Sequence, residues 1–147
     1  MHSLEEIIAS GKFHESVRGR LTQAQNGTPA GPDSDACKAD AAYRAAFGAA
    51  VTKTMDALTL DAFVYPTWNF PPQLLGQTSQ GSAGDNSQVF SPTSGFPAMT
   101  VPMGYTHDGT LPAGMTIFGR AWSEATLIRL AYAFEQATHH RKPPQMK

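Results

Sequence analysis

The sequence is poor in charge, in cysteine and in long apolar runs, and each shortage excludes a class of protein. Its 147 residues carry a net charge of −1 and a single cysteine, so no basic surface for nucleic acid is predicted. No stretch approaches the roughly 18 apolar residues of a membrane helix. Cys37 alone cannot form an internal disulfide, and no signal peptide follows Met1. We therefore expect a cytoplasmic protein with neither nucleic-acid nor membrane partners.

The common signatures of metal, phosphate and dinucleotide sites are also missing from the sequence. There is no cysteine cluster, no phosphate loop and no dinucleotide fingerprint. His139 and His140 are adjacent, so on a helix they point apart, unlike a metal-binding pair spaced by four residues. A favourable interaction with a helix C-terminus explains them better. We predict no metal and no cofactor.

A self-contained serine hydrolase finds little support in the sequence. A serine nucleophile needs a base within hydrogen-bond reach and an oriented oxyanion site. Ser82 and Ser87 lie in a glycine-bearing loop that has no G-x-S-x-G motif. No lysine occurs between Lys53 and Lys142, so no lysine base is expected nearby. We predict no catalytic residue in this chain, and an independent hydrolase that uses Ser82 or Ser87 is the weakest alternative.

Local signals divide the chain into a short N-terminal part and a larger α/β part. Residues 1–32 are predicted to form short helices and a loop, with Ser3 and Glu6 as a capping box and Gly11 as the first helix end. Residues 33–147 are predicted to contain a long helix, a strand, a long loop, a hairpin and a last helix.

The clearest helix is predicted over residues 33–58. Apolar residues recur there at spacings of four and three, which is typical of a helix face that packs in a core. This stripe consists of Tyr43, Phe47, Val51, Met55 and Leu58. A cofactor site on the stripe is possible but a poor explanation of such spacing. A buried strand over 60–65 follows, which Pro66 ends, and the loop over 66–90 is long enough to cover a site.

The uncharged stretch from Phe90 to Tyr105 organises the second half of the chain. Ser91 is expected to cap one helical turn that Gly95 ends. A strand over 98–101 is expected to end at Pro102, because proline cannot donate to a ladder.

A hairpin and a helix are predicted after this stretch. Asp108-Gly109 indicates a tight turn that leads to a partner strand over 113–118. Ser123 is expected to cap the last helix. The buried face of that helix is predicted to be Leu127, Leu130, Ala131 and Phe134.

The middle of the chain has far fewer charges than an ordinary soluble domain. Between residues 62 and 119 the only charged residues are Asp85 and Asp108, where average usage would supply roughly 14. A polar, uncharged surface is one explanation. We favour burial inside a larger body, because a small domain has too much surface to bury the whole segment.

Four sequence blocks taken together resemble the C-terminal part of the amidase signature family. Within that family, their sequences are most similar to those of amidases related to peptide amidase. The blocks are LDAFVYPT (60–67), DNSQVFSPTSGFPAMTVPMGY (85–105), LPAGMTIFGRAWSEATLIRLAYAFEQAT (111–138) and RKPP (141–144). The resemblance implies an α/β fold: the C-terminal portion of a layered mixed β-sheet with flanking helices, incomplete as a stand-alone fold. It also implies carboxamide hydrolysis by a serine, a second serine in a cis peptide and a lysine, none of which matches a residue here.

This resemblance implies that the chain is a C-terminal fragment of an amidase-type amidohydrolase. A carboxamide substrate would be bound only together with the missing catalytic part. Residues from two loops would then wall the substrate cleft: Pro66, Thr67, Trp68, Asn86, Phe90 and Ser91. The alternative from another class is a non-catalytic interaction module that self-associates through strand edges, and a homo-oligomer is therefore also expected.

Overall fold

A computed structural model of the chain describes residues 2–27, 31–72 and 84–143. The chain forms two compact units, Met1–Asp40 (unit 1) and Ala41–Lys147 (unit 2). The predicted boundary between residues 32 and 33 falls inside unit 1 and stays a prediction. None of the helices among the described residues is long and apolar enough to cross a membrane.

Unit 1 contains short helices whose ends follow the local signals of the sequence. Helix α1 (Leu4–Ser10) begins at Ser3, whose hydroxyl accepts the Glu6 N–H at 3.1 Å, and it ends at Gly11 in the left-handed conformation. A 3₁₀ turn η1 (Glu15–Val17) leads into α2 (Arg18–Asn26). The predicted N-cap and C-cap of α1 are therefore confirmed.

Helix α3 (Asp35–Ala57) carries the predicted apolar stripe, but only part of the stripe is buried. Val51 and Met55 are buried, and Gly48 lets the Phe96 ring approach the helix backbone. Tyr43 and Leu58 are each 62% exposed. The prediction was wrong for these two stripe ends, because periodicity identifies a helix face but not how far its neighbours extend along it.

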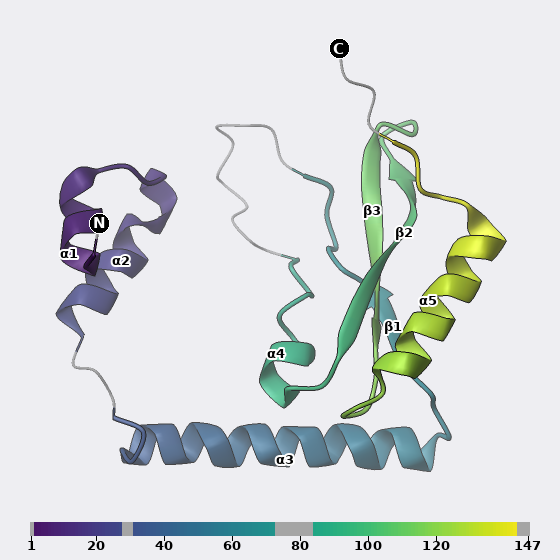
Figure 1. Ribbon diagram of the computed structural model, residues 1–147, viewed down its shortest axis with the longest axis horizontal. Coiled ribbons are helices and arrows are strands. Elements are labelled where there is room, and N and C mark those ends of the chain that lie inside the picture. The colour runs from purple at the N-terminus through teal and green to yellow at the C-terminus, as the bar shows by residue number, and fades with distance from the viewer. Residues whose placement is uncertain (1, 28–30, 73–83, 144–147) are drawn as a thin grey trace. The chain divides into compact units, whose positions relative to one another are not determined.

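The sheet of unit 2 consists of β1 (Phe63–Pro66), β2 (Ala98–Thr106) and β3 (Leu111–Phe118) in the order β1-β3-β2 (Figure 1). Both pairings are antiparallel, and Phe118 lies opposite both Phe63 and Ala98. Helices and sheet together confirm the predicted α/β class. Among the described strands the sheet is purely antiparallel.

Strand β2 is longer than predicted because it passes through Pro102. Pro102 lies opposite Gly114, and the register then shifts so that Gly104 lies opposite Ala113. Met103 is thus the extra residue of a β-bulge. Prolines are tolerated on edge strands and at bulges, and β2 is an edge strand of the described sheet with a bulge at this point. The prediction that Pro102 ends the strand was wrong, whereas the Asp108-Gly109 turn is confirmed by its positive φ angles of 54° and 84°.

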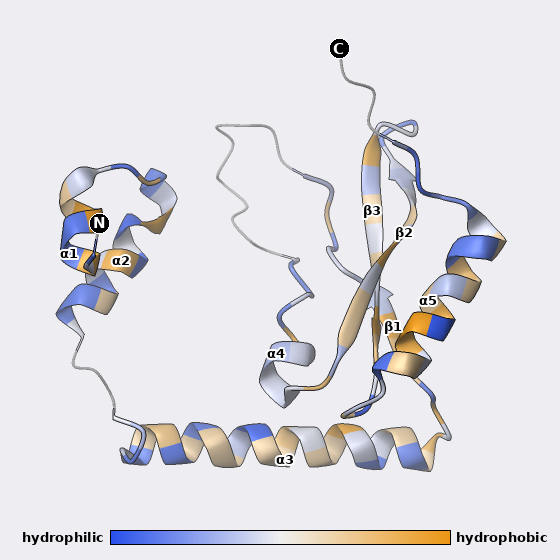
Figure 2. Cartoon of the chain, in the orientation of Figure 1, coloured by the Kyte–Doolittle hydropathy of each residue, from blue (hydrophilic) through white to orange (hydrophobic). Residues whose placement is uncertain are grey.

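Apolar side chains pack on both faces of the sheet. On one face, helix α5 (Glu124–Thr138) buries Leu127 and Ala131 against Val101 and Ile117, and apolar residues lie on the α5 turns nearest the strands (Figure 2). The other face holds a second cluster, made of the buried residues Val51, Met55 and Phe118 and the partly buried aromatic residues Phe47, Phe63, Tyr65, Phe90 and Phe96. The predicted inner face of α5 is confirmed.

The short helix α4 (Ser91–Ser94) begins one residue earlier than predicted. Phe90 is its N-cap, and the Ser91 hydroxyl donates to the Phe96 carbonyl at 2.7 Å instead of capping. Gly95 ends the helix with φ at 73°. Ser91 therefore holds the segment that connects α4 to β2, and the prediction that Ser91 is the N-cap was wrong.

Removing the Tyr65 hydroxyl is expected to stabilise unit 2. This oxygen is buried and has no hydrogen-bond partner among the described residues. An unpaired buried hydroxyl costs about 1–3 kcal/mol. Tyr65→Phe should therefore raise the free energy of unfolding in urea, whereas Tyr43→Phe, at an exposed ring, should leave it unchanged. A loss in Tyr65→Phe would show that the hydroxyl is paired.

The same variant is expected to change the response of stability to alkaline pH. Burial raises the pKa of Tyr65 above its ordinary value. The unfolded phenol therefore ionises at a lower pH than the folded one, so Tyr65 makes stability fall as pH rises above about 10. Tyr65→Phe should show a smaller alkaline loss than the wild type in urea unfolding at about pH 8 and 11.

Candidate functional site

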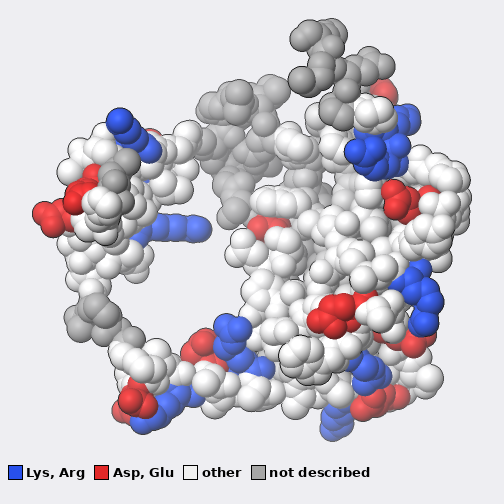
Figure 3. All heavy atoms as spheres, in the orientation of Figure 1, with Lys and Arg blue, Asp and Glu red and all other residues white. Residues whose placement is uncertain are grey.

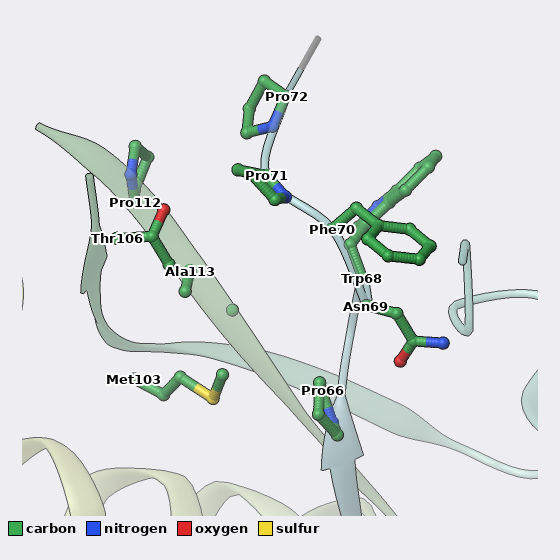
Figure 4. A pocket seen from close by; sticks show the side chains of 11 residues that line it. Pro66, Trp68, Asn69, Phe70, Pro71, Pro72, Met103, Thr106, Pro112 and Ala113 are labelled. Atoms are coloured by element: carbon green, nitrogen blue, oxygen red, sulfur yellow. The ribbon is translucent and has the colours of Figure 1, made fainter. Parts of the chain in front are cut away.

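Unit 2 contains a pocket of about 590 Å³ (Figure 4). It lies between the segment that follows β1 and the half of the β2–β3 hairpin that is nearer to the hairpin turn. Its lining residues are Pro66, Trp68, Asn69, Phe70, Pro71, Pro72, Met103, Thr106, Pro112, Ala113 and Gly114. None of them carries a charge. A volume of this size is typical of sites for small molecules, which measure about 300–1,000 Å³.

The wall formed by residues 66–72 is held by backbone hydrogen bonds on both sides. On the sheet side, the Thr67 N–H donates to the Gly114 carbonyl at 2.8 Å. On the other side, the Asn86 N–H donates to the Thr67 carbonyl at 2.9 Å, and the Asn69 N–H donates to the Gly84 carbonyl at 2.8 Å. Residues 66–69 of the wall thus continue the pairing with β3 and are held in place by hydrogen bonds within the chain.

The Asn86 side chain strengthens this arrangement. Its Nδ2 group donates to the Pro66 carbonyl and to Asn69 Oδ1, each at 2.8 Å. The Pro66 carbonyl can only accept, so the contacting atom of Asn86 is its amide nitrogen. Asn86 therefore holds the segment at two points with one group.

Gly84 allows the Phe70 ring to lie close to the backbone of the returning segment. Its φ is 90°, and a Cβ at this position would lie 2.7 Å from a Phe70 ring carbon. A side chain there would displace the ring and strain the backbone. Gly84 therefore sets the position of one aromatic side chain of the pocket wall.

A row of threonine hydroxyls connects the wall to the sheet. Thr67 Oγ1 lies 2.8 Å from Thr116 Oγ1, which in turn lies 3.3 Å from Thr100 Oγ1. Thr116 is buried, so these neighbours satisfy its hydroxyl where water is absent. The row fixes the base of the pocket wall.

The predicted cleft-wall residues fall into three groups. Pro66 and Trp68 line the pocket, while Thr67 and Asn86 hold its wall. Phe90 packs against Tyr65 with 5.3 Å between ring centres, and Ser91 binds the Phe96 carbonyl. The cleft-wall assignment as a whole stays a prediction.

The sequence reasoning missed the hairpin side of the pocket. Met103, Thr106 and Pro112 come from strands that local patterns treat only as sheet. Met103 extends toward Pro66 in the close view (Figure 4). The available signal was the Pro102–Gly104 interruption of β2, since bulges often re-aim a side chain next to a site.

Nucleophile and base do not meet in a catalytic arrangement in the part of the chain that the structure describes. The Ser87 hydroxyl donates to Asp85 Oδ1 at 2.5 Å, and the same oxygen accepts the Ser87 N–H, which is a local turn. His14 Nδ1 lies 2.8 Å from Ser16 Oγ, but it is exposed and caps the turn η1. Ser82 lies outside the described residues. No group of three His, Cys, Asp or Glu gathers among those that are described.

Comparisons with known proteins agree on one family. A model of the Amidase family matches residues 1–128. The chain is 36% identical over 91 residues to a subunit of the glutamyl-tRNA(Gln) amidotransferase of Oceanobacillus iheyensis, a match that covers 58% of this chain and 18% of the relative. It is 37% identical over 86 residues to a fatty acid amide hydrolase of Medicago truncatula, covering 52% of this chain and 14% of the relative. The chain thus spans less than a fifth of these relatives.

Solved structures give the same answer over the whole chain. The peptide amidase PAM in complex with the competitive inhibitor chymostatin matches with a TM-score of 0.71 and 32% identity, covering 99% of this chain and 30% of that one. The native peptide amidase of Stenotrophomonas maltophilia matches with a TM-score of 0.68 and 31% identity over the same shares.

Proposed function

Because this chain belongs to the amidase family, we propose that it serves the hydrolysis of carboxamide C–N bonds by building part of the substrate cleft. The family predicted from the four sequence blocks is thereby confirmed. The proposal goes further and assigns the chain to the C-terminal part of such an enzyme. The serine, second serine and lysine of the reaction would then be supplied by another segment. The single cysteine supports a cytoplasmic location for this enzyme.

The observation that carries the proposal is the extent of the structural match. The fold of 99% of this chain agrees with 30% of a peptide amidase at a TM-score of 0.71. A fold alone does not determine a function, so the pocket matters as a second support. It is concave and mostly apolar, and hydrogen bonds hold part of its wall, features that are common in sites for small molecules.

In this proposal the residues of the chain position the substrate and leave the chemistry to the supplied serine. The serine oxygen attacks the amide carbonyl, ammonia or an amine leaves, and water hydrolyses the acyl-enzyme. The pocket would hold a part of the substrate that does not react. Thr67 and Asn86 act as positioning residues, since their hydrogen bonds hold the wall. Correct placement of the reacting carbonyl is a large part of catalysis.

The chain alone is expected to release no ammonia from carboxamides. Among the described residues, Ser87 is hydrogen-bonded to neither a histidine nor a lysine, and its hydroxyl donates to Asp85 within a local turn. Purified protein should be incubated with simple and peptide carboxamides and assayed for ammonia. Turnover that disappears in Ser82→Ala or Ser87→Ala would contradict the proposal and support a self-contained hydrolase.

A chimaera tests the positive side of the proposal. This chain would replace the matching 30% of the Stenotrophomonas maltophilia peptide amidase. The chimaera is expected to hydrolyse carboxamides, whereas the peptide amidase without that segment is expected to be inactive. A folded chimaera that remains inactive would contradict the proposed function. If the 66–72 wall positions the substrate, the substitution Asn86→Ala in the chimaera should lower its rate of carboxamide hydrolysis.

A further inference from the structure

We propose that the pocket between residues 66–72 and the β2–β3 hairpin receives an uncharged, apolar group of the amide substrate, aromatic or branched aliphatic, and rejects charged groups. This inference rests on the proposed function and specifies the class of substrate. Three features support it: the lining of the pocket, the charges around it and the stiffness of its wall.

The lining provides apolar contacts and no counter-charge. Four prolines, Trp68, Phe70 and Met103 form most of it. The polar side chains are Asn69, which accepts a hydrogen bond from Asn86, and Thr106, whose hydroxyl donates to the Leu111 carbonyl at 3.5 Å. A charged group at this lining would meet no counter-charge, whereas an apolar group would gain contact with the prolines and aromatic rings.

Asp85 lies beside the pocket wall, and its carboxylate is already hydrogen-bonded. Its backbone pairs with that of Trp68 in an isolated β-bridge, and its Oδ1 accepts two hydrogen bonds from Ser87. Elsewhere in unit 2, charged side chains gather along α3, on the side of α5 and beside the end of the hairpin (Figure 3), where the Lys142 ammonium lies 5.1 Å from the centre of the Tyr105 ring. The absence of charge is thus a property of the pocket lining and not of the surface around it.

The wall is stiff on one side and adaptable on the other. Pro66, Pro71 and Pro72 restrict the backbone of the 66–72 segment, and Gly84 and Asn86 hold it from behind. Opposite them, the β-bulge places Met103, whose flexible thioether adapts to ligands of different shape. Such a pocket discriminates between ligand groups by their charge more than by their exact shape.

The test uses the chimaera, with the serine nucleophile of its peptide amidase part replaced by alanine so that the probes are not hydrolysed, and three matched probes. They are 3-phenylpropanamide and its analogues that carry a carboxylate or an aminomethyl group on the ring. Affinities come from calorimetry, and the site is located by the NMR shift of the Met103 methyl group. The neutral amide should bind at least about tenfold more tightly than either charged analogue, which corresponds to about 1.4 kcal/mol. Equal affinities, or binding that leaves the Met103 signal unmoved, would overturn the proposal.

A charge introduced into the pocket gives the matched control. Met103 is 36% exposed, so lysine fits there without burying its ammonium group. Met103→Lys should weaken the neutral probe and strengthen the carboxylate probe, whereas Ile128→Lys, on the exposed side of α5, should change neither. If Met103→Lys binds the neutral and the carboxylate probe with the same affinities as Ile128→Lys does, the proposal is overturned. Selective binding combined with an inactive chimaera would instead reject the proposed function alone, and an active chimaera without selectivity would reject this inference alone.

Discussion

Truncation of Phe118 to alanine is expected to remove a large part of the stability of unit 2. Phe118 is fully buried at the end of β3, and its ring centre lies 5.5 Å from that of Phe90 and 6.2 Å from that of Phe96. It also packs in one cluster with Met55 of α3. Loss of such a side chain costs about 3–5 kcal/mol, against a total of about 5–15 kcal/mol for an ordinary domain.

The size of this loss follows from what Phe118 connects. Its strand neighbours are Phe63 on β1 and Ala98 on β2. A cavity at this point would separate α3 and α4 from all three strands at once. The surrounding side chains relax only in part around such a cavity, so the lost contacts are not recovered.

Urea unfolding followed by Trp68 fluorescence at submicromolar concentration measures the effect. Trp122→Ala is the matched control, because that aromatic side chain is 92% exposed and its loss should change stability by no more than about 0.5 kcal/mol. Similar losses in both variants would contradict the position of the core described here.

The features that the sequence predicts correctly depend on residues a few positions apart. Ser3 caps α1, Gly11 and Gly95 end helices, and Asp108-Gly109 makes the hairpin turn, all within four residues of their partners. Each requires a local hydrogen bond or a positive φ that few residue types supply. The same is true of the α5 stripe, which one periodic face defines.

The errors arise where a distant partner decides the outcome. Pro102 stays in its strand because Gly114 and the bulge accommodate it. Tyr43 is exposed because none of the described segments of unit 2 covers that turn of α3. The pocket combines residues after β1 with residues of the hairpin about 35–45 positions later. Local patterns contain no information about such pairings, so only the post-β1 wall could be proposed from the sequence.

The isolated chain is expected to self-associate at micromolar concentration. Within the described part of the sheet, β1 pairs with β3 on one side only, which leaves its other edge without a strand. Val64, in the middle of that edge strand, is 62% exposed. An unpaired edge presents free N–H and C=O groups that another chain can bind, and apolar contact adds about 25 cal/mol per Å² removed from water.

Light scattering measures the self-association of the chain, and near-UV circular dichroism measures its packing, with Trp68 and Trp122 as reporters. Val64→Lys is expected to shift the chain toward the monomer, because a charge on an edge strand opposes pairing with a second chain. Ile128→Lys is the control: it places the same charge on an apolar residue that is 55% exposed but lies on α5. If both lysines disperse the chain equally, general surface apolarity and not the β1 edge drives the association.

The state of the wild-type chain also separates the two function classes. A C-terminal amidase segment leaves the β1 edge and the uncharged middle of unit 2 for the rest of the enzyme to cover, so the segment alone should associate or lose fixed packing. An independent module has to cover both by itself. A monomer with a strong near-UV signal and cooperative unfolding would therefore contradict the amidase-segment proposal, because such a chain would need no further strand to complete its sheet.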